Sequence, residues 1–149
     1  MRAVVQRVSD ARVTVSGRIL GRIEEGLLVY LGVAGGDEDP DLKYTVDKVV
    51  NLRIFPDGSG KMNLSVLDTG GAVLVVSQFT LCGDARQGRR PSYTAAAEPE
   101  KARSFYDRFA EEIRSRGIRV ETGEFAARME VRYTNVGPVT ILLDSTKLF

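Results

Sequence analysis

The ten residues AVLVVSQFTL (72–81) decide the fold class of this 149-residue chain. A valine-rich apolar run of this length is typical of a strand that is buried on both faces of a sheet. The run GLLVYLGV (26–33) has the same character. We therefore expect two buried strands, the second of which brings Ser77, Gln78, Phe79 and Thr80 to the surface.

Shorter β-branched runs with polar interruptions predict the other strands. They lie near residues 4–8, 13–15, 19–23, 51–55, 118–121, 129–133 and 138–143. Two helices are expected, starting at Asp39-Pro40 and at Glu98-Pro99, because acidic residues and proline favour a first helical turn. We therefore expect an α+β fold, a curved, barrel-like mixed β-sheet with two main helices packed outside, as a single domain over residues 1–149.

The composition is that of an ordinary globular protein, with 43% hydrophobic and 28% charged residues and a net charge of +1. This charge does not indicate nucleic-acid binding, so any RNA contact needs a local patch. Arg86, Arg89 and Arg90 form one candidate, and a merely solvated loop is the alternative. We find no signal peptide and no apolar run long enough for a membrane helix, and we expect a cytoplasmic protein without membrane contact.

The chain contains no histidine, which excludes Ser-His-Asp and Cys-His mechanisms and the common zinc sites. We expect no metal and no cofactor. The lone Cys82 lacks an imidazole partner, so a packing role is favoured over a nucleophilic one. Ser77 and Thr80 are either plain hydrogen-bonding caps of a strand or, with Gln78 and backbone N–H groups, a neutral site that polarises a carbonyl.

The second stretch of interest is Asn135-Val136-Gly137-Pro138-Val139-Thr140, which precedes a predicted strand. Glycine followed by proline most often makes a plain turn. Local sequence does not say whether the Gly137-Pro138 bond is cis or trans.

These motifs together resemble the bacterial and eukaryotic type of D-aminoacyl-tRNA deacylase over essentially the whole chain. The matching segments are residues 1–8, 51–55, 61–63, 76–81, 88–92 and 135–140. One position departs from the family pattern: Ala126 stands where the pattern has glycine, in Gly123-Glu124-Phe125-Ala126-Ala127. Its methyl group is expected beside the pocket.

The resemblance implies a hydrolase of translation quality control, a cytoplasmic homodimer that binds aminoacyl-tRNA at its 3′-terminal adenosine. It implies a cis Gly-Pro pair that enters the partner's pocket and rejects L-amino acids by collision, so that D-aminoacyl- and glycyl-tRNA are accepted. The catalytic residues implied are Ser77, Gln78, Phe79 and Thr80. The substrate-binding residues implied are Arg7, Ala102, Phe125, Met129, Gly137 and Pro138.

The missing histidine favours hydrolysis assisted by a hydroxyl of the terminal ribose of the tRNA, which lies beside the ester. Thr80 as a covalent nucleophile is the second choice, because no obvious base accompanies it. Two other functions stay open: a non-catalytic nucleic-acid-binding protein on the same scaffold, and a small-molecule binding or amidohydrolase domain.

Overall fold

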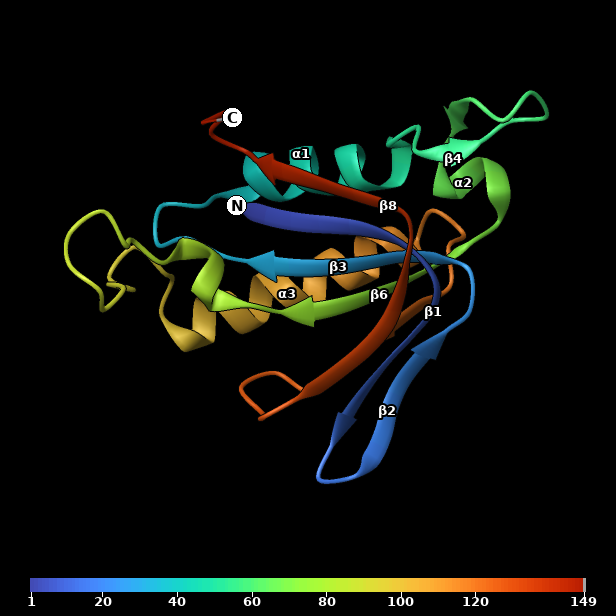
Figure 1. Ribbon diagram of the computed structural model, residues 1–149. Coiled ribbons are helices and arrows are strands. Elements are labelled where there is room, and N and C mark those ends of the chain that lie inside the picture. The colour runs from blue at the N-terminus through green and yellow to red at the C-terminus, as the bar shows by residue number, and fades with distance from the viewer. Residues whose placement is uncertain (149) are drawn as a thin grey trace.

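The computed structural model describes residues 1–148, and a six-stranded mixed sheet forms its centre (Figure 1). The strands are β1 (Arg2–Val15), β2 (Arg18–Ile23), β3 (Gly26–Gly32), β6 (Ala72–Ser77), β7 (Val120–Thr122) and β8 (Glu130–Asp144). They run in the order β2-β1-β3-β6-β7, and β8 also pairs with β1. The β3–β6 and β6–β7 pairs are parallel, and the three pairs that involve β1 are antiparallel.

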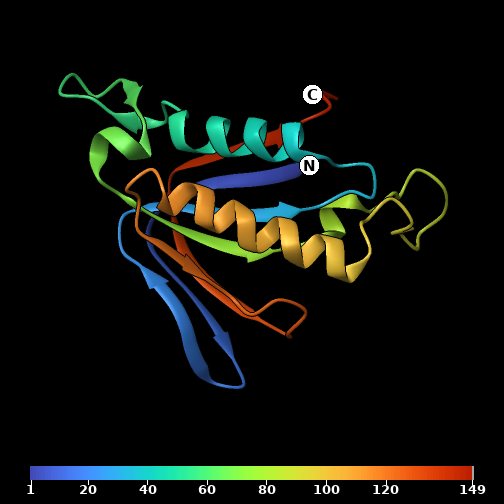
Figure 2. The same cartoon turned by 180° about the vertical axis from the view of Figure 1, so that it is seen from behind.

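The helices and the small second sheet complete the chain. They are α1 (Asp39–Asn51), α2 (Val66–Thr69), α3 (Pro99–Arg114), the 3₁₀ turn η1 (Phe79–Cys82), and the strands β4 (Phe55–Pro56) and β5 (Met62–Leu64). Seen from behind, α1 and α3 lie side by side across one face of the sheet (Figure 2). α3 carries an apolar stripe that is buried against the sheet, Ala102, Phe105, Phe109 and Ile113.

Two apolar cores hold these layers together, and the central strands contribute to both. Leu27, Val29, Val73 and Val75 face the helices. The intervening Leu28, Leu74 and Val76 face the second core, inside the curl of β1 and β2. Because successive side chains of a strand point to opposite faces, full burial of both sets confirms that β3 and β6 are covered on both faces.

The curl of the sheet brings β2 back towards β6 and β7 and nearly closes a barrel. Gly21 marks the closest approach, because a Cβ atom there would lie 2.8 Å from the carbonyl oxygen of Thr122 and 3.2 Å from Leu74 Cδ1. The expected fold class, a barrel-like mixed sheet with its helices outside, is confirmed.

Several predicted boundaries are wrong. The runs at 4–8 and 13–15 form one strand, β1, and those at 129–133 and 138–143 form one strand, β8. These strands pair with each other along their length through two irregularities in register, which let them bend without ending. The predicted strand at 51–55 is mostly absent from the described residues, because α1 runs to Asn51 and a tight turn, Ile54 N–H to the Leu52 carbonyl, follows.

The predicted strand 72–81 ends early, at Ser77, and this correction bears on the site. Gln78 still donates its N–H to the Leu31 carbonyl at 2.8 Å, but β3 ends one residue later, at Gly32. Residues 79–82 then fold over Gly32 as η1, and a Cβ atom at Gly32 would lie 2.9 Å from Leu81 Cβ. The backbone turns at this point because the neighbouring strand offers no further partner.

Candidate functional site

A pocket of about 390 Å³ opens at the edge of the sheet where β3 and β6 end. Its walls are Leu31, Val33, Ser77, Phe79, Ala96, Ala97, Pro99, Ala102, Phe125, Ala126, Ala127 and Met129. These residues come from the ends of the parallel strands, the start of α3 and the connection between β7 and β8. The carboxyl ends of parallel strands with crossover helices are a common place for ligand sites, because several loops converge there.

Five of the predicted site residues line this pocket: Ser77, Phe79, Ala102, Phe125 and Met129. All twelve lining residues lie within the described part of the chain, and none of them is ionisable. The pocket is therefore an apolar cavity with the Ser77 hydroxyl at one wall. It suits a neutral group, such as a carbonyl, better than a free charge.

Gln78 and Thr80 do not line the pocket but stand beside it, in the turn that follows Ser77. The Gln78 side-chain amide donates a hydrogen bond to the Thr80 hydroxyl oxygen. The first hydrogen bond of η1 runs from Leu81 N–H to the Gln78 carbonyl, at 3.2 Å. The N–H groups of Phe79 and Thr80 precede it and have no partner within the turn, as at the start of any helix.

Arg2 anchors the η1 turn, a role that no sequence motif indicates. Its guanidinium donates to the Leu81 carbonyl at 2.8 Å and to the Asp144 carboxylate at 2.9 Å. Asp144 is buried, so the ion pair ties η1 to the end of β8. An arginine at the first position of a strand carries no sequence signal for such a contact.

Cys82 closes η1 and is buried. Burial raises the pKa of its thiol, and the nearby Arg2 offsets this only in part. A raised pKa disfavours the thiolate, which is the nucleophilic form. Cys82 does not line the pocket, and its place in the structure is that of a packing residue, as expected.

Tyr106 packs behind the pocket residue Phe125, and no sequence motif indicates this role either. Its hydroxyl donates to the Val75 carbonyl at 2.9 Å, and its ring lies 6.1 Å from that of Phe125. Burial raises the pKa of Tyr106 to about 12, so this donor stays protonated at neutral pH. The sequence showed Tyr106 only as one more aromatic residue on a helix.

The connection that carries Phe125 is a tight turn with an unusual residue in it. Ala127 N–H pairs with the Glu124 carbonyl at 3.2 Å, and Ala126 has a φ of +63°. That conformation favours glycine, because the Cβ atom of an L-residue is crowded there. The residue at which the chain departs from the family pattern therefore lines the pocket in a left-handed conformation.

The second motif forms a bend in the middle of β8. The Gly137-Pro138 bond is cis, and Gly137 has a φ of +129°. Asn135 spans the bend, since its side-chain oxygen accepts from Val139 N–H at 2.9 Å. Arg7 lies behind it and donates to the Val136 carbonyl at 3.1 Å and to the Ile54 carbonyl at 2.6 Å. Residues 136–138 are exposed.

This bend is far from the pocket of its own chain. The register runs from Ser77 to Leu31, to Ala3 and on to Leu143, so Ser77 and Leu143 lie in one row across the sheet. Thr140 pairs with Gln6 and Asn135 with Val8, so the bend lies opposite Arg7, four residues or roughly 13 Å along β1 from Ala3. Ser77 lies a further two strands across the sheet from Ala3. Gly137, Pro138 and Arg7 are accordingly not among the residues that line the pocket.

Over residues 1–148, no helix is long and apolar enough to cross a membrane.

Comparison with known proteins gives a consistent result. The family model described as D-Tyr-tRNA(Tyr) deacylase matches residues 4–144. Proteins named D-aminoacyl-tRNA deacylase from Thermosipho melanesiensis, Thermotoga petrophila and Koribacter versatilis are 59%, 58% and 60% identical to this chain, with 100% of both chains covered.

Two solved structures share the fold. One, titled c-Myc DNA Unwinding Element Binding Protein, is 42% identical with a TM-score of 0.91, and the match covers 97% of this chain and 98% of the other. The other, described as a probable eukaryotic D-amino acid tRNA deacylase, is 21% identical with a TM-score of 0.81, over 95% and 97% of the two chains. The family model and the full-length relatives together show that this chain belongs to the D-Tyr-tRNA(Tyr) deacylase family.

Proposed function

We propose that this protein is a cytoplasmic D-aminoacyl-tRNA deacylase, which hydrolyses the ester between a D-amino acid and tRNA. Its full-length relatives bear that name. The observation that carries the proposal is the apolar pocket with Ser77 in its wall and the η1 turn at its rim. The ester group itself is uncharged, and a pocket of this kind accommodates an uncharged, partly apolar group.

The N–H groups of Phe79 and Thr80 support a role for η1 in holding the ester. They precede the first hydrogen bond of the turn, as described above. Donors placed in this way stabilise the negative charge that develops on a carbonyl oxygen during attack by water. The Ser77 and Gln78 side chains add neutral donors on the same side.

The chain has no histidine and the pocket no ionisable lining residue, so we infer that the substrate helps to activate the water. A free hydroxyl of the terminal ribose lies next to the ester and is already positioned by binding. The Thr80 hydroxyl accepts a hydrogen bond from Gln78. This contact suits a positioning role for Thr80 better than a nucleophilic one, since it withdraws rather than adds electron density at the oxygen.

We further propose that the protein is a homodimer in which Gly137 and Pro138 of one copy inspect the substrate in the pocket of the other. The separation of roughly 13 Å along β1, together with the strands between, supports supply from a second copy, because Gly137 and Pro138 do not line the pocket of their own chain. Exposed apolar side chains on β8, Tyr133, Val136 and Leu142, offer a surface for such a partner.

Carbonyl groups held close to the α-carbon would collide with an L side chain and leave a D side chain free. Recognition by exclusion accepts many D-amino acids, and it also accepts glycine, which has no side chain to exclude. We therefore include glycyl-tRNA, such as that mischarged on tRNA-Ala, among the substrates.

The experiment is deacylation of D-tyrosyl-, L-tyrosyl- and glycyl-tRNA by the purified protein. We expect turnover of the D and glycyl substrates and none of the L substrate above the uncatalysed rate. A protein inert toward D-tyrosyl-tRNA would overturn the proposed activity, and equal rates on D and L substrates would overturn the filter.

A second candidate function is nucleic-acid binding without catalysis, because the structural relative of 42% identity is titled a DNA Unwinding Element Binding Protein. Binding of uncharged DNA or RNA without any ester turnover would favour this candidate.

A further inference from the structure

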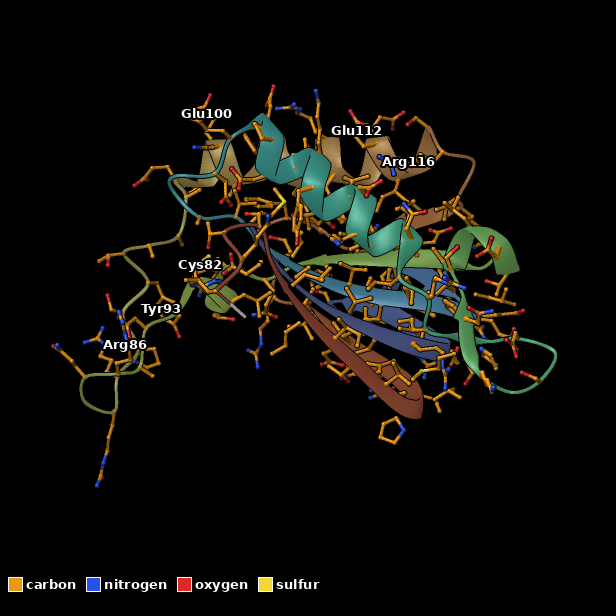
Figure 3. The ribbon with its side chains drawn as sticks, turned by 90° about the horizontal axis from the view of Figure 1, so that it is seen from above. Cys82, Arg86, Tyr93, Glu100, Glu112 and Arg116 are labelled. Carbon is orange, nitrogen blue, oxygen red and sulfur yellow. The ribbon has the colours of Figure 1, made fainter. Side chains whose placement is uncertain are left out.

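The loop between η1 and α3 projects from the end of the molecule at which the pocket opens (Figures 1 and 2). Its base is a short antiparallel bridge, in which Asp84 and Ser92 exchange two backbone hydrogen bonds of 2.8 Å. Figure 3 shows that Arg86 and Tyr93 lie on this projection, beyond Cys82. We call residues 83–93 the projecting loop. They have no role in the hydrolysis proposed above.

The projecting loop joins the pocket through a pair of exposed aromatic rings. Phe79, a wall of the pocket, is 55% exposed, and Tyr93 is 39% exposed. Their ring centroids lie 5.1 Å apart at an interplanar angle of 67°. Tyr93 also packs against Gly83, where a Cβ atom would lie 2.9 Å from its ring. Large aromatic faces are left open to solvent directly at the mouth of the pocket.

One arginine of the projecting loop is held in an ion pair, and two are not. Asp84 holds Arg86 through hydrogen bonds of 2.9 and 2.6 Å, and this pairing lowers the pKa of Asp84. Arg89 and Arg90 are exposed and make no ion pair with any residue in 1–148. Two guanidinium groups are thus free on the loop that carries Tyr93, in a chain whose net charge is only +1.

We propose that the projecting loop binds the single-stranded nucleotides that precede the terminal adenosine of the tRNA. Exposed aromatic rings next to free arginines form the usual surface for unpaired nucleic acid, in which bases stack on the rings and phosphates meet the cations. This inference rests on the proposed function, since it places the 3′ end of the same substrate on a surface continuous with the pocket. It assigns Arg89 and Arg90 to the phosphates and Tyr93 to a base.

The first test compares a full substrate with a minimal one, D-tyrosyl-tRNA with D-tyrosyl-adenosine. The variant Arg89→Ala/Arg90→Ala is expected to lose roughly tenfold in kcat/KM on the tRNA and nothing on the adenosine ester, which lacks the preceding phosphates. The slope of log kcat/KM against log salt should become shallower by about 1.4, the value for two contacts to a single strand. The advantage of the wild type over the variant should then shrink about sevenfold between 50 and 200 mM salt.

A matched control, Arg18→Ala/Lys61→Ala, removes the same net charge from two exposed positions on other turns. It should behave as the wild type does on both substrates. An equal loss in the control would mean that only overall charge matters and would overturn the inference. So would full activity of the Arg89→Ala/Arg90→Ala variant on the tRNA, or an equal loss on both substrates.

The second test addresses Tyr93 by direct binding of a fluorescent single-stranded RNA ending in CCA. Tyr93→Leu should weaken binding about fivefold or more, whereas Tyr93→Phe, which keeps the ring, should bind as the wild type does. Unchanged binding by Tyr93→Leu would refute a stacking role.

A wild-type protein that hydrolyses neither ester would overturn the proposed function itself. Failure of the proposed function is therefore distinguishable from failure of the inference about the projecting loop.

Discussion

The pocket at the end of β6 and the bend in β8 are built in opposite ways. The pocket is assembled by one chain, from four segments that converge where parallel strands end, and its walls are packed from behind by α3. The bend is exposed, and side-chain hydrogen bonds from Asn135, Arg7 and Gln6 hold it. An exposed bend is suited to contact a neighbouring molecule, so this difference supports the proposal that the pocket and the bend of one working site come from two copies of the chain.

The largest effect is expected when the bend is displaced by Gly137→Ala. A Cβ atom there would lie 2.7 Å from Val139 Cγ2 and 2.9 Å from Arg7 Nη2, and φ is +129°, so the bend must move. A shift of about 1 Å in a positioning element costs roughly a hundredfold in rate, which we expect for deacylation of D-tyrosyl-tRNA.

Gly58→Ala is the control for this substitution, since a Cβ atom at Gly58 meets nothing within 4 Å. It should retain wild-type kinetics. Wild-type kinetics in Gly137→Ala as well would show that the bend has no part in the site.

Arg2→Met tests whether the two regions are mechanically joined. The change removes the donors to Leu81 and to the buried Asp144, so we expect a loss of about 1.5–3 kcal/mol in the free energy of unfolding by urea. Because η1 loses its anchor, kcat should fall roughly tenfold with KM little changed. Arg22→Met, which loses an exposed ion pair with Asp10, should cost less than about 1 kcal/mol and leave kcat intact.

Tyr106→Phe probes the support behind the pocket through its pH dependence. Burial raises the pKa of Tyr106 to about 12, so its stabilisation is complete below pH 10 and is lost as pH rises towards about 12. At pH 8 the variant should have a free energy of unfolding about 1 kcal/mol lower than the wild type, because it lacks the hydrogen bond to the Val75 carbonyl. Between pH 8 and pH 11 the free energy of unfolding should fall less in the variant than in the wild type. Parallel stability profiles for the two proteins from pH 8 to 11 would contradict the assignment.

The smallest effect is expected for Ala126→Gly. Relief of the left-handed conformation favours glycine by about 1–2 kcal/mol, and the greater freedom of glycine in the unfolded chain offsets about 0.4–1 kcal/mol of that. Urea denaturation should therefore show a net gain of up to about 1.6 kcal/mol. A destabilised variant would show that the methyl group makes contacts that outweigh its strain.

The sequence predicted the central sheet well because burial on both faces leaves a plain signal. The apolar runs at 26–33 and 72–76 have strand length and contain several β-branched residues, which favours buried strands over helices. The sequence predicted two strands in place of β1 and two in place of β8, because polar residues at the irregularities in register resemble turns. The sequence did not predict the end of β6 at Ser77. This end depends on where the neighbouring strand β3 stops, and the local sequence of β6 carries no information about that.

The site shows the same division between local and long-range information. Ser77 and Phe79 were indicated by a motif, and Phe125 and Met129 by the family resemblance. The structure brings these four residues to one pocket. Arg2 and Tyr106 were not visible, because their roles lie in contacts to backbone carbonyls 79 and 31 residues away. The left-handed turn at Ala126 was signalled only by its departure from the family pattern.

The most direct test of the central claim, that one copy supplies the pocket and another the bend, is a mixed dimer. Ala102→Phe fills the pocket of its own chain, and Gly137→Ala displaces the bend of its own chain. Each pure variant should be inactive, whereas unfolding and refolding the two together should restore about a quarter of wild-type activity, since half of the dimers hold one intact site of two. No recovery in mixtures that contain the mixed dimer would contradict the account.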